Sequence, residues 1–143
     1  MNVMRQAMLV VLFLAMGAEV AMAGRTQIVL QWLDTAQGGM DLQEIYKIED
    51  ALEAVSSGKY EVDGHDVGSG TVNVFLYAED SKVDSVIAAV ILFFERGKLP
   101  KGMRIGRAIY EDEKRRNWHF QPVYPPGLAE FRIMYAPGTA VPK

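Results

Sequence analysis

The sequence contains no cysteine and only two histidines, His65 and His119. A chain without thiols cannot use a cysteine nucleophile, exchange disulfides or bind metal through sulfur, and it cannot carry a lipid on a cysteine. In an oxidising compartment, where small domains often contain disulfides, it must be held together by burial alone. Nucleic-acid binding is also disfavoured, because the formal net charge is −3 and phosphate contacts need a basic surface.

Known catalytic motifs are missing as well. The sequence has no hydrolase elbow, dinucleotide fingerprint, zinc-protease helix or lysozyme-type carboxylate pair. The segment Gly68-Ser69-Gly70 precedes a predicted strand, whereas a phosphate-binding loop must open a helix. We therefore predict no cofactor and no metal, and we expect a protein that is not an enzyme.

The first 23 residues have the layout of an export signal. Arg5 supplies the positive charge, and the apolar run at 7–15 is too short for a membrane-spanning helix of about 20 residues. Ala21-Met22-Ala23 fits an A-x-A cleavage site. The alternative is an uncut anchor, but Glu19 interrupts the apolar stretch. We expect cleavage after Ala23, a periplasmic or secreted protein, and no membrane association of the mature chain.

The charges are unevenly distributed along the chain. Residues 34–84 hold 12 acidic and 3 basic side chains, whereas residues 95–143 hold 10 basic and 5 acidic ones. Such polarity predicts two oppositely charged surface patches that would orient a partner. The alternative is a fold that interleaves the two halves and cancels the field.

The periodicity of apolar residues, and the glycines and prolines that interrupt it, predict one domain after the leader. This domain has a core at 24–112 and an extension at 113–143. Asp41 and Glu44 form a capping-box pattern at the start of a helix that runs to about residue 56. Its apolar stripe comprises Leu42, Ile45, Ile48, Leu52 and Val55. A second helix at 83–95 is apolar nearly all round, so we expect it to be largely buried. The predicted strands are 27–33, 60–67, 71–78, 103–110, 118–124 and a short one at 131–135.

The order βαββαβ is that of the ferredoxin-like fold, an α+β architecture with an antiparallel sheet and two helices on one face. The C-terminal extension then either lengthens the sheet or covers its open face. Element order is a sound basis for a fold class, but it says little about function.

The predicted hairpin around Gly68-Ser69 contains a conflict. With these two residues as the whole turn, Tyr60 faces Tyr77 and Val62 faces Phe75. Asp63 and His65 then share a face with valines that should be core. A bulge near Gly64 would remove the conflict by shifting the register by one residue, so we predict an irregularity there.

Polar candidates for a site fall in two groups. Asp63 and His65, next to Asp66, could act as a general base and the residue that orients it, or could supply two ligands to zinc. However, only one other histidine is present, and a metal site needs three or four ligands. We favour a solvated hairpin end. The second group is cationic, with Arg104, Arg107 and the basic run 114–116. Arg107 falls on the same strand face as the apolar Met103, Ile105 and Ile109, so it either pairs with an acid there or lines a pocket on that face.

Aromatic side chains are concentrated on the predicted strands: Trp32, Tyr60, Phe75, Tyr77, Tyr110, Trp118, Phe120 and Tyr124. If several share the helix-free face, they form a platform for a partner protein or a small ligand. Burial under the C-terminal extension is the alternative.

The leading hypothesis is an exported, non-enzymatic binding domain, of an immunity or inhibitor type by analogy, that contacts a protein partner or a second copy. The alternative is a dimeric ferredoxin-like enzyme that binds a small molecule in the same face, with inward polar groups such as His119, Arg107 or His65. Seven residues are the candidates for partner or ligand binding: Asp63, His65, Tyr77, Arg104, Arg107, Trp118 and His119.

Overall fold

The computed structural model describes residues 24–33, 39–68 and 70–133. The predicted export signal at 1–23 and the end of the predicted strand at 131–135 lie outside the described residues. Within these ranges, no helix has the length and apolarity needed to cross a membrane. The elements are β1 (Arg25–Leu33), α2 (Leu42–Ser56), β2 (Tyr60–Gly68), β3 (Thr71–Glu79), the 3-10 turn η1 (Asp80–Lys82), α3 (Val83–Glu95), β4 (Arg104–Tyr110) and β5 (Trp118–Tyr124).

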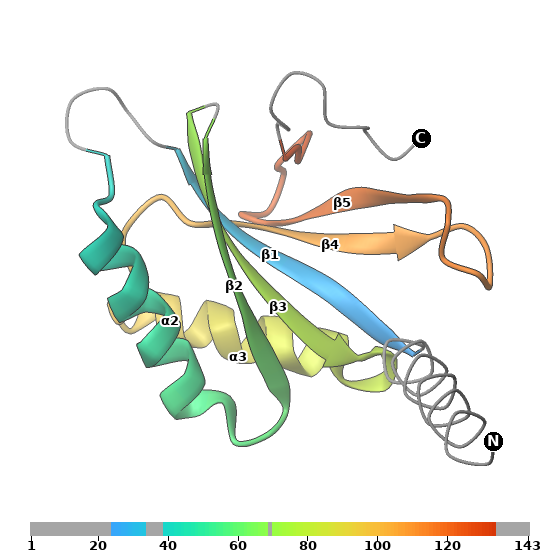
Figure 1. The fold of residues 1–143 in the computed structure, drawn as a ribbon, viewed down its shortest axis with the longest axis horizontal. Helices are drawn as coiled ribbons and strands as arrows, with labels where there is room; N and C mark the ends of the chain where they lie inside the picture. Colours follow the sequence, from blue (N-terminus) through green and yellow to red (C-terminus); the bar gives the residue numbers. More distant parts are fainter. Residues whose placement is uncertain (1–23, 34–38, 69, 134–143) are drawn as a thin grey trace, which may run out of the picture.

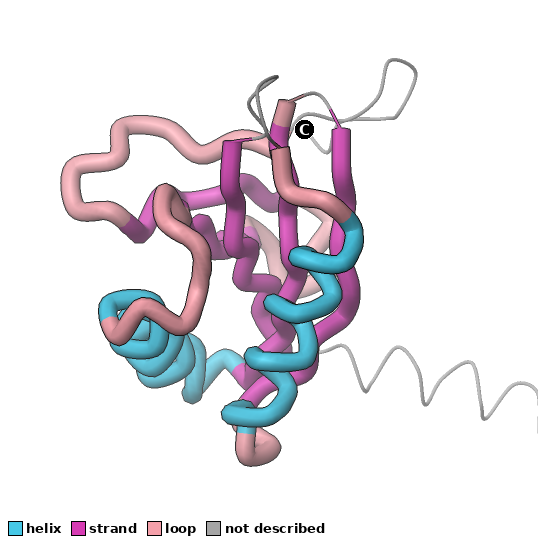
Figure 2. The backbone as a smooth tube through the Cα atoms, turned by 90° about the vertical axis from the view of Figure 1, so that its left-hand side faces the viewer, coloured by secondary structure: helices cyan, strands magenta, loops and turns pink. Residues whose placement is uncertain are grey.

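The protein is an α+β domain with one five-stranded sheet, in the order β2-β3-β1-β4-β5. Every neighbouring pair of strands is antiparallel. Both helices lie on the same side of this sheet, as Figure 1 and Figure 2 show. The sheet therefore has one helix-covered face, and we call the opposite one the helix-free face.

Helix α2 begins as the sequence predicts. The Asp41 side chain accepts a hydrogen bond from the Glu44 backbone N–H at 2.8 Å, and the Glu44 carboxylate accepts one from the Asp41 N–H at 3.1 Å. The middle of the predicted stripe, Ile45, Ile48 and Leu52, is buried. Its two ends, Leu42 and Val55, are exposed, so the buried stripe is shorter than predicted.

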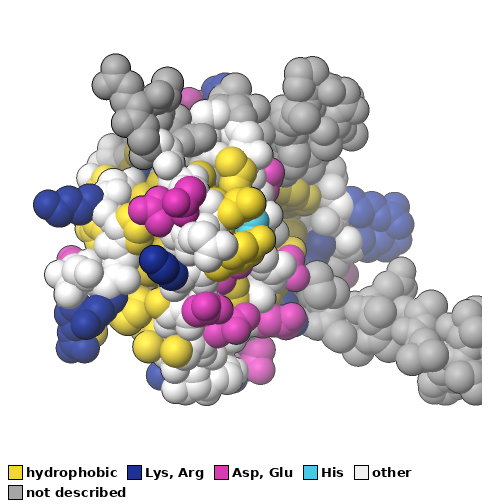
Figure 3. Space-filling model, turned by 60° about the vertical axis from the view of Figure 1, so that its left-hand side comes forward, with side chains coloured by type: hydrophobic (Ala, Val, Ile, Leu, Met, Phe, Trp, Pro, Cys, Tyr) yellow, Lys and Arg dark blue, Asp and Glu magenta, His cyan; other side chains and the backbone are white. Residues whose placement is uncertain are grey.

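Helix α3 is buried on one side only, which corrects the expectation of a largely buried helix. Its sheet-facing residues Val83, Val86, Ile87 and Val90 lie in the core, whereas Leu92 is 47% exposed. An all-apolar helix can leave one side open when no further layer covers it. Figure 3 shows hydrophobic side chains reaching the surface among charged ones on the side of the molecule that it brings forward.

The main core lies between the helices and the helix-covered face. It joins α2 and α3 to alternate residues of the central strands, with Ile28 and Leu30 from β1 and Val74 and Leu76 from β3 fully buried. Burial of aliphatic side chains of this size contributes about 1.5–3 kcal/mol each. A chain without cysteine is held together in this way.

The β2–β3 hairpin carries the predicted irregularity. The register shifts between Val62 and Gly64, and Gly64 has a φ of 119°. The turn is displaced, however, because Gly68 pairs with Thr71. The predicted pairs are therefore wrong: Tyr60 lies opposite Ala78 rather than opposite Tyr77.

Part of the helix-free face is covered by the segment that follows β5. Phe131 and Ile133 are buried and pack with Val29 in a second, smaller core cluster. Residues 131–133 form no strand. The prediction of a strand at 131–135 is therefore wrong for the three residues that the structure describes. The extension does both things that the sequence left open: β5 lengthens the sheet, and the following segment covers one end of the open face.

The acidic and basic halves of the chain are separated in the sheet but joined by ion pairs. The strands β2 and β3 of the acidic half lie on one side of β1, and β4 and β5 of the basic half lie on the other. Arg107 pairs with Asp84 at 2.8 Å, and Arg115 pairs with Asp80 at 2.5 Å. Two of the basic side chains are thus neutralised by carboxylates from the acidic half.

Candidate functional site

The uncovered part of the helix-free face is built from alternate residues of all five strands. Tyr77 lies opposite Gln27 across β3 and β1, and Tyr110 lies opposite Trp118 across β4 and β5. Side chains two apart on a strand share a face. The sequence alternation therefore places aromatic side chains from three strands on one surface.

These side chains surround a pocket of about 320 Å³. We call it the aromatic pocket, and its lining residues are Gln27, Asp66, Phe75, Tyr77, Tyr110, Trp118 and Ile133. The four aromatic rings are all half-buried, so each presents part of its surface to a ligand. Ile133 belongs to the segment that covers the other end of the face, and it joins that cover to the pocket.

The pocket contains one carboxylate together with groups that can donate, namely the Gln27 amide, the two tyrosine hydroxyls and the Trp118 indole. Gln27 donates from Nε2 to the Tyr77 hydroxyl at 2.9 Å, which leaves the amide oxygen of Gln27 as its remaining acceptor. Asp66 adds a carboxylate. Burial raises the pKa of Tyr77, the charge of Asp63 and the neighbouring Tyr110 raise it further, and Gln27 and Arg25 oppose the shift. Tyr77 is therefore a neutral hydroxyl at physiological pH.

Two guanidinium groups already stack on tyrosines of the pocket. The Arg25 guanidinium lies 5.7 Å from the centre of the Tyr77 ring, and that of Arg115 lies 4.2 Å from the centre of the Tyr110 ring. Arg25 also pairs with Glu61 at 2.9 Å, and the charge of Arg115 is compensated by Asp80. These contacts show that the ring faces are accessible to cations.

The β5 side of the pocket is a line of edge-to-face rings. Trp118 and Phe120 have ring centres 5.0 Å apart, and Phe120 and Phe131 have ring centres 5.7 Å apart. Such pairs contribute about 0.5–1.5 kcal/mol beyond the area that they bury. The line connects Trp118 to the buried Phe131 and so fixes the wall of the pocket.

Of the candidates chosen from the sequence, Tyr77 and Trp118 line the aromatic pocket. Asp63 lies at the bulge and acts electrostatically on Tyr77. Arg104 is on the same face, opposite Gln31, and donates a hydrogen bond to the Gln31 side chain. Gln31 in turn donates to the Arg132 carbonyl at 2.8 Å, so Arg104 belongs to the covered end of the face.

The other three candidates lie on the helix-covered face. His65 contacts Glu49 of α2 at 2.8 Å, so the bulge separates it from Asp63, contrary to the shared face that the sequence predicts. Arg107 pairs with Asp84 of α3, so the first of the two predictions for it, pairing with an acid, is confirmed. His119 contacts Glu111 at 3.1 Å at the opposite edge strand.

The two histidines do not form a site together. They lie on the two edge strands β2 and β5, four strand spacings apart, which is roughly 19 Å. Among the described residues, no group of three or more acidic or histidine side chains is arranged to hold a metal ion.

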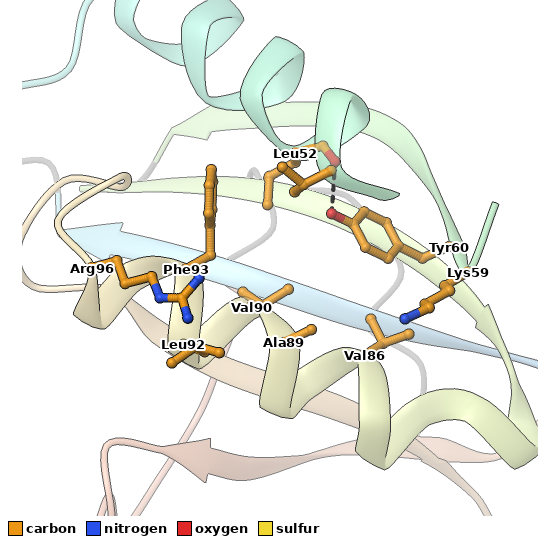
Figure 4. A pocket seen from close by; sticks show the side chains of 10 residues that line it. Leu52, Lys59, Tyr60, Val86, Ala89, Val90, Leu92, Phe93 and Arg96 are labelled. Carbon is orange, nitrogen blue, oxygen red and sulfur yellow. Dashed lines mark hydrogen bonds between the residues drawn. The ribbon is translucent and has the colours of Figure 1, made fainter. Parts of the chain in front are cut away.

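A second hollow, the interhelical groove, lies between α2 and α3 on the other side of the sheet. Figure 4 shows its apolar floor and the rings of Tyr60 and Phe93, with Lys59 and Arg96 at opposite ends. Its volume is about 210 Å³. The Tyr60 hydroxyl donates to the Leu52 carbonyl at 2.6 Å. The hydroxyl of Tyr60 therefore has its hydrogen-bond partner in α2, and the ring of Tyr60 forms an apolar wall of the groove.

Sequence reasoning missed Gln27, Asp66 and Ile133 as pocket residues. A signal for Gln27 was present, because it alternates with the buried Ile28 at the start of a strand. No comparable signal existed for Ile133, which reaches the pocket through a segment without regular structure. Asp66 lies on the face opposite to that of His65, as the alternation of the strand predicts, and it reaches the pocket from the edge strand β2.

Comparison with known proteins adds no functional information to this geometry. The chain matches no protein-family model and shows no significant similarity to a curated protein or to a solved structure.

Proposed function

We propose that this protein is an exported, non-enzymatic binding domain whose contact surface is the aromatic pocket on the helix-free face. The observation that carries the proposal is the convergence of four half-buried aromatic rings with an amide and a carboxylate around one hollow. Binding sites are typically concave and largely apolar, with a few placed polar groups that fix orientation. The proposed occupant is a side chain or small group that a partner presents.

The aromatic pocket fits this role better than the interhelical groove. Its volume of about 320 Å³ falls within the usual range of ligand pockets, about 300–1,000 Å³, and that of the groove falls below it. Tyr77, Tyr110 and Trp118 are also of the residue types that supply most binding energy at protein interfaces, with Trp and Tyr foremost.

The proposal includes a ferredoxin-like core and cleavage of the leader after Ala23. The element order βαββαβ and the sheet order β2-β3-β1-β4 support such a core, with β5 as an addition. Mass spectrometry of the exported chain tests the cleavage, and an N-terminus at Gly24 is expected. The enzyme alternative gains no support, since its two histidines lie on opposite edge strands.

A matched pair of variants tests the contact surface. Trp118→Ala removes a ring of the pocket, and Leu92→Ala removes an exposed apolar side chain from the other side of the sheet. Each variant, immobilised, is used to capture binding proteins from the native envelope fraction. We expect Trp118→Ala to lose the partner that the unchanged protein and Leu92→Ala retain. Loss with Leu92→Ala alone would instead place the contact surface on the helices.

A further inference from the structure

The ligand chemistry that suits the aromatic pocket follows from the charges and ring faces around it. We infer that the pocket selects an organic cation, a quaternary ammonium or guanidinium group, over a neutral group of the same shape. This inference rests on the proposed function and specifies the group that the pocket receives.

The rings are the first argument. Tyr77, Tyr110, Trp118 and Phe75 come from three strands and line one hollow. The face of an aromatic ring carries partial negative charge, and a cation within about 6 Å of its centre is attracted to it. The guanidinium groups of Arg25 and Arg115 already lie over the rings of the two tyrosines. Their ring faces are therefore suited to cations in this fold.

The polar groups are the second argument. Asp66 lines the pocket, and Asp63 lies close enough to Tyr77 to act on it electrostatically. Neither carboxylate forms an ion pair within the part of the chain that the structure describes. The nearby Arg25 and Arg115, in contrast, are each paired with a carboxylate. The uncompensated charge at the pocket is therefore negative.

The acceptors of the pocket suit a cation. The Gln27 amide oxygen and the Asp66 carboxylate can accept hydrogen bonds from a guanidinium. The pocket also has donors, in the second Gln27 N–H, the tyrosine hydroxyls and the Trp118 indole, but an anionic ligand would lie beside the Asp66 carboxylate. A guanidinium would supply donors, and a quaternary ammonium would supply charge without any need for acceptors.

Three probes test the inference, with the Trp118 indole N–H as the reporter in two-dimensional NMR and the Trp32 indole as the internal control. Trp32 is buried on the other side of the sheet and donates to the Pro100 carbonyl. The probes are choline, its neutral carbon isostere 3,3-dimethylbutanol, and Nα-acetylarginine amide. We expect at least one cation to shift only the Trp118 signal and to bind about tenfold more tightly than the isostere, a difference of about 1.4 kcal/mol.

The pattern of binding distinguishes a free cationic solute from a cationic side chain of a partner. It also tests the cation preference separately from the binding function of the pocket. Tighter binding of choline indicates a free quaternary ammonium solute, and tighter binding of the arginine amide indicates a side chain of a partner. Equal binding of choline and isostere overturns the cation preference but leaves the binding pocket standing. If no probe moves the Trp118 signal while capture of a partner still depends on Trp118, the inference alone is wrong.

A charge variant provides the sharper control, because it leaves every ring in place. Asp66→Asn should weaken binding of the preferred cation about threefold or more and leave the weak binding of the isostere unchanged. Asp50→Asn removes one negative charge from an exposed position on α2 and should change neither. An equal effect of the two substitutions would reduce the preference to long-range net charge and would overturn the assignment to the pocket.

Discussion

Tyr60 shows how one residue connects the two layers of the molecule. It lies at the start of β2, is 9% exposed, and donates its hydroxyl proton to the Leu52 carbonyl of α2. Burial raises the pKa of Tyr60 to about 12. The folded state therefore favours the neutral phenol more strongly than the unfolded chain does.

We predict that this residue makes the protein sensitive to high pH. Because the folded pKa is raised, the stabilisation is complete below the unfolded pKa of about 10 and is lost as the pH rises through about 12. The loss amounts to roughly 2–3 kcal/mol of unfolding free energy. Denaturant unfolding at pH 8 to 12 measures it, and Tyr60→Phe should be less stable at pH 8 but should show a smaller loss. Parallel curves for the two proteins would refute this role of Tyr60.

Gly64 is the residue on which the arrangement of the β2 side chains depends. Its φ of 119° lies in a region that residues with a Cβ rarely adopt. A Cβ at this position would meet no atom within 4 Å, so any cost of a side chain comes from the backbone alone.

We expect Gly64→Ala to lower the free energy of unfolding by about 1–3 kcal/mol. Gly68→Ala is the matched control, because its position is equally open and its φ is not positive. We expect a change of less than about 0.5 kcal/mol there. Urea unfolding of the two variants gives both values, and a similar cost at both positions would mean that the bulge does not need glycine.

At the scale of elements, the segment after β5 is attached to the sheet mainly through Phe131. Gly106 of β4 leaves the space for this ring, since a Cβ there would lie 2.3 Å from Phe131 Cδ1. Gln31 adds the hydrogen bond to the Arg132 carbonyl. The covered end of the helix-free face thus depends on the absence of one side chain.

A double-mutant cycle tests this attachment. Gly106→Ala should cost about 1–3 kcal/mol through the steric conflict with the ring. In a Phe131→Ala background the same substitution should cost almost nothing, because the conflicting atoms are gone. Denaturant unfolding of the four proteins gives the coupling energy. Additive effects would show that the segment does not rest on Gly106.

The sequence predicts elements better than it predicts faces. The capping pair Asp41 and Glu44, the apolar periodicity of α2 and the alternation in 118–124 are local signals, and these elements lie where they were expected. The irregularity at Gly64 was also predictable, because a polar residue on a core face is a visible conflict. Such signals act within a few residues of the chain.

The pocket itself could be predicted only in part. The displaced turn changes the strand pairs but leaves His65 and Asp66 on the opposite faces that the alternation predicts, whereas the bulge separates Asp63 from His65. The exposed side of α3 and the burial of Ile133 depend on which segments cover which surface. That is a property of the tertiary structure, and no local pattern carries it.

At the scale of the whole molecule, the two sides of the sheet have different roles in our account. The helix-covered side holds the main core, and two polar contacts join its helices to its strands, Arg107 with Asp84 and His65 with Glu49. The helix-free side divides into an end sealed by Phe131 and Ile133 and an end that holds the aromatic pocket. We place recognition at that open end.

The most direct test of this placement is photo-crosslinking in the native cell. A benzoylphenylalanine residue, which keeps an aromatic side chain at the position, replaces Trp118 at the pocket in one protein and Leu92 on α3 in another, and covalent adducts are identified after irradiation. Our account predicts an adduct with a partner from position 118 and none from position 92. An adduct from position 92 alone, or equal adducts from both, would contradict it.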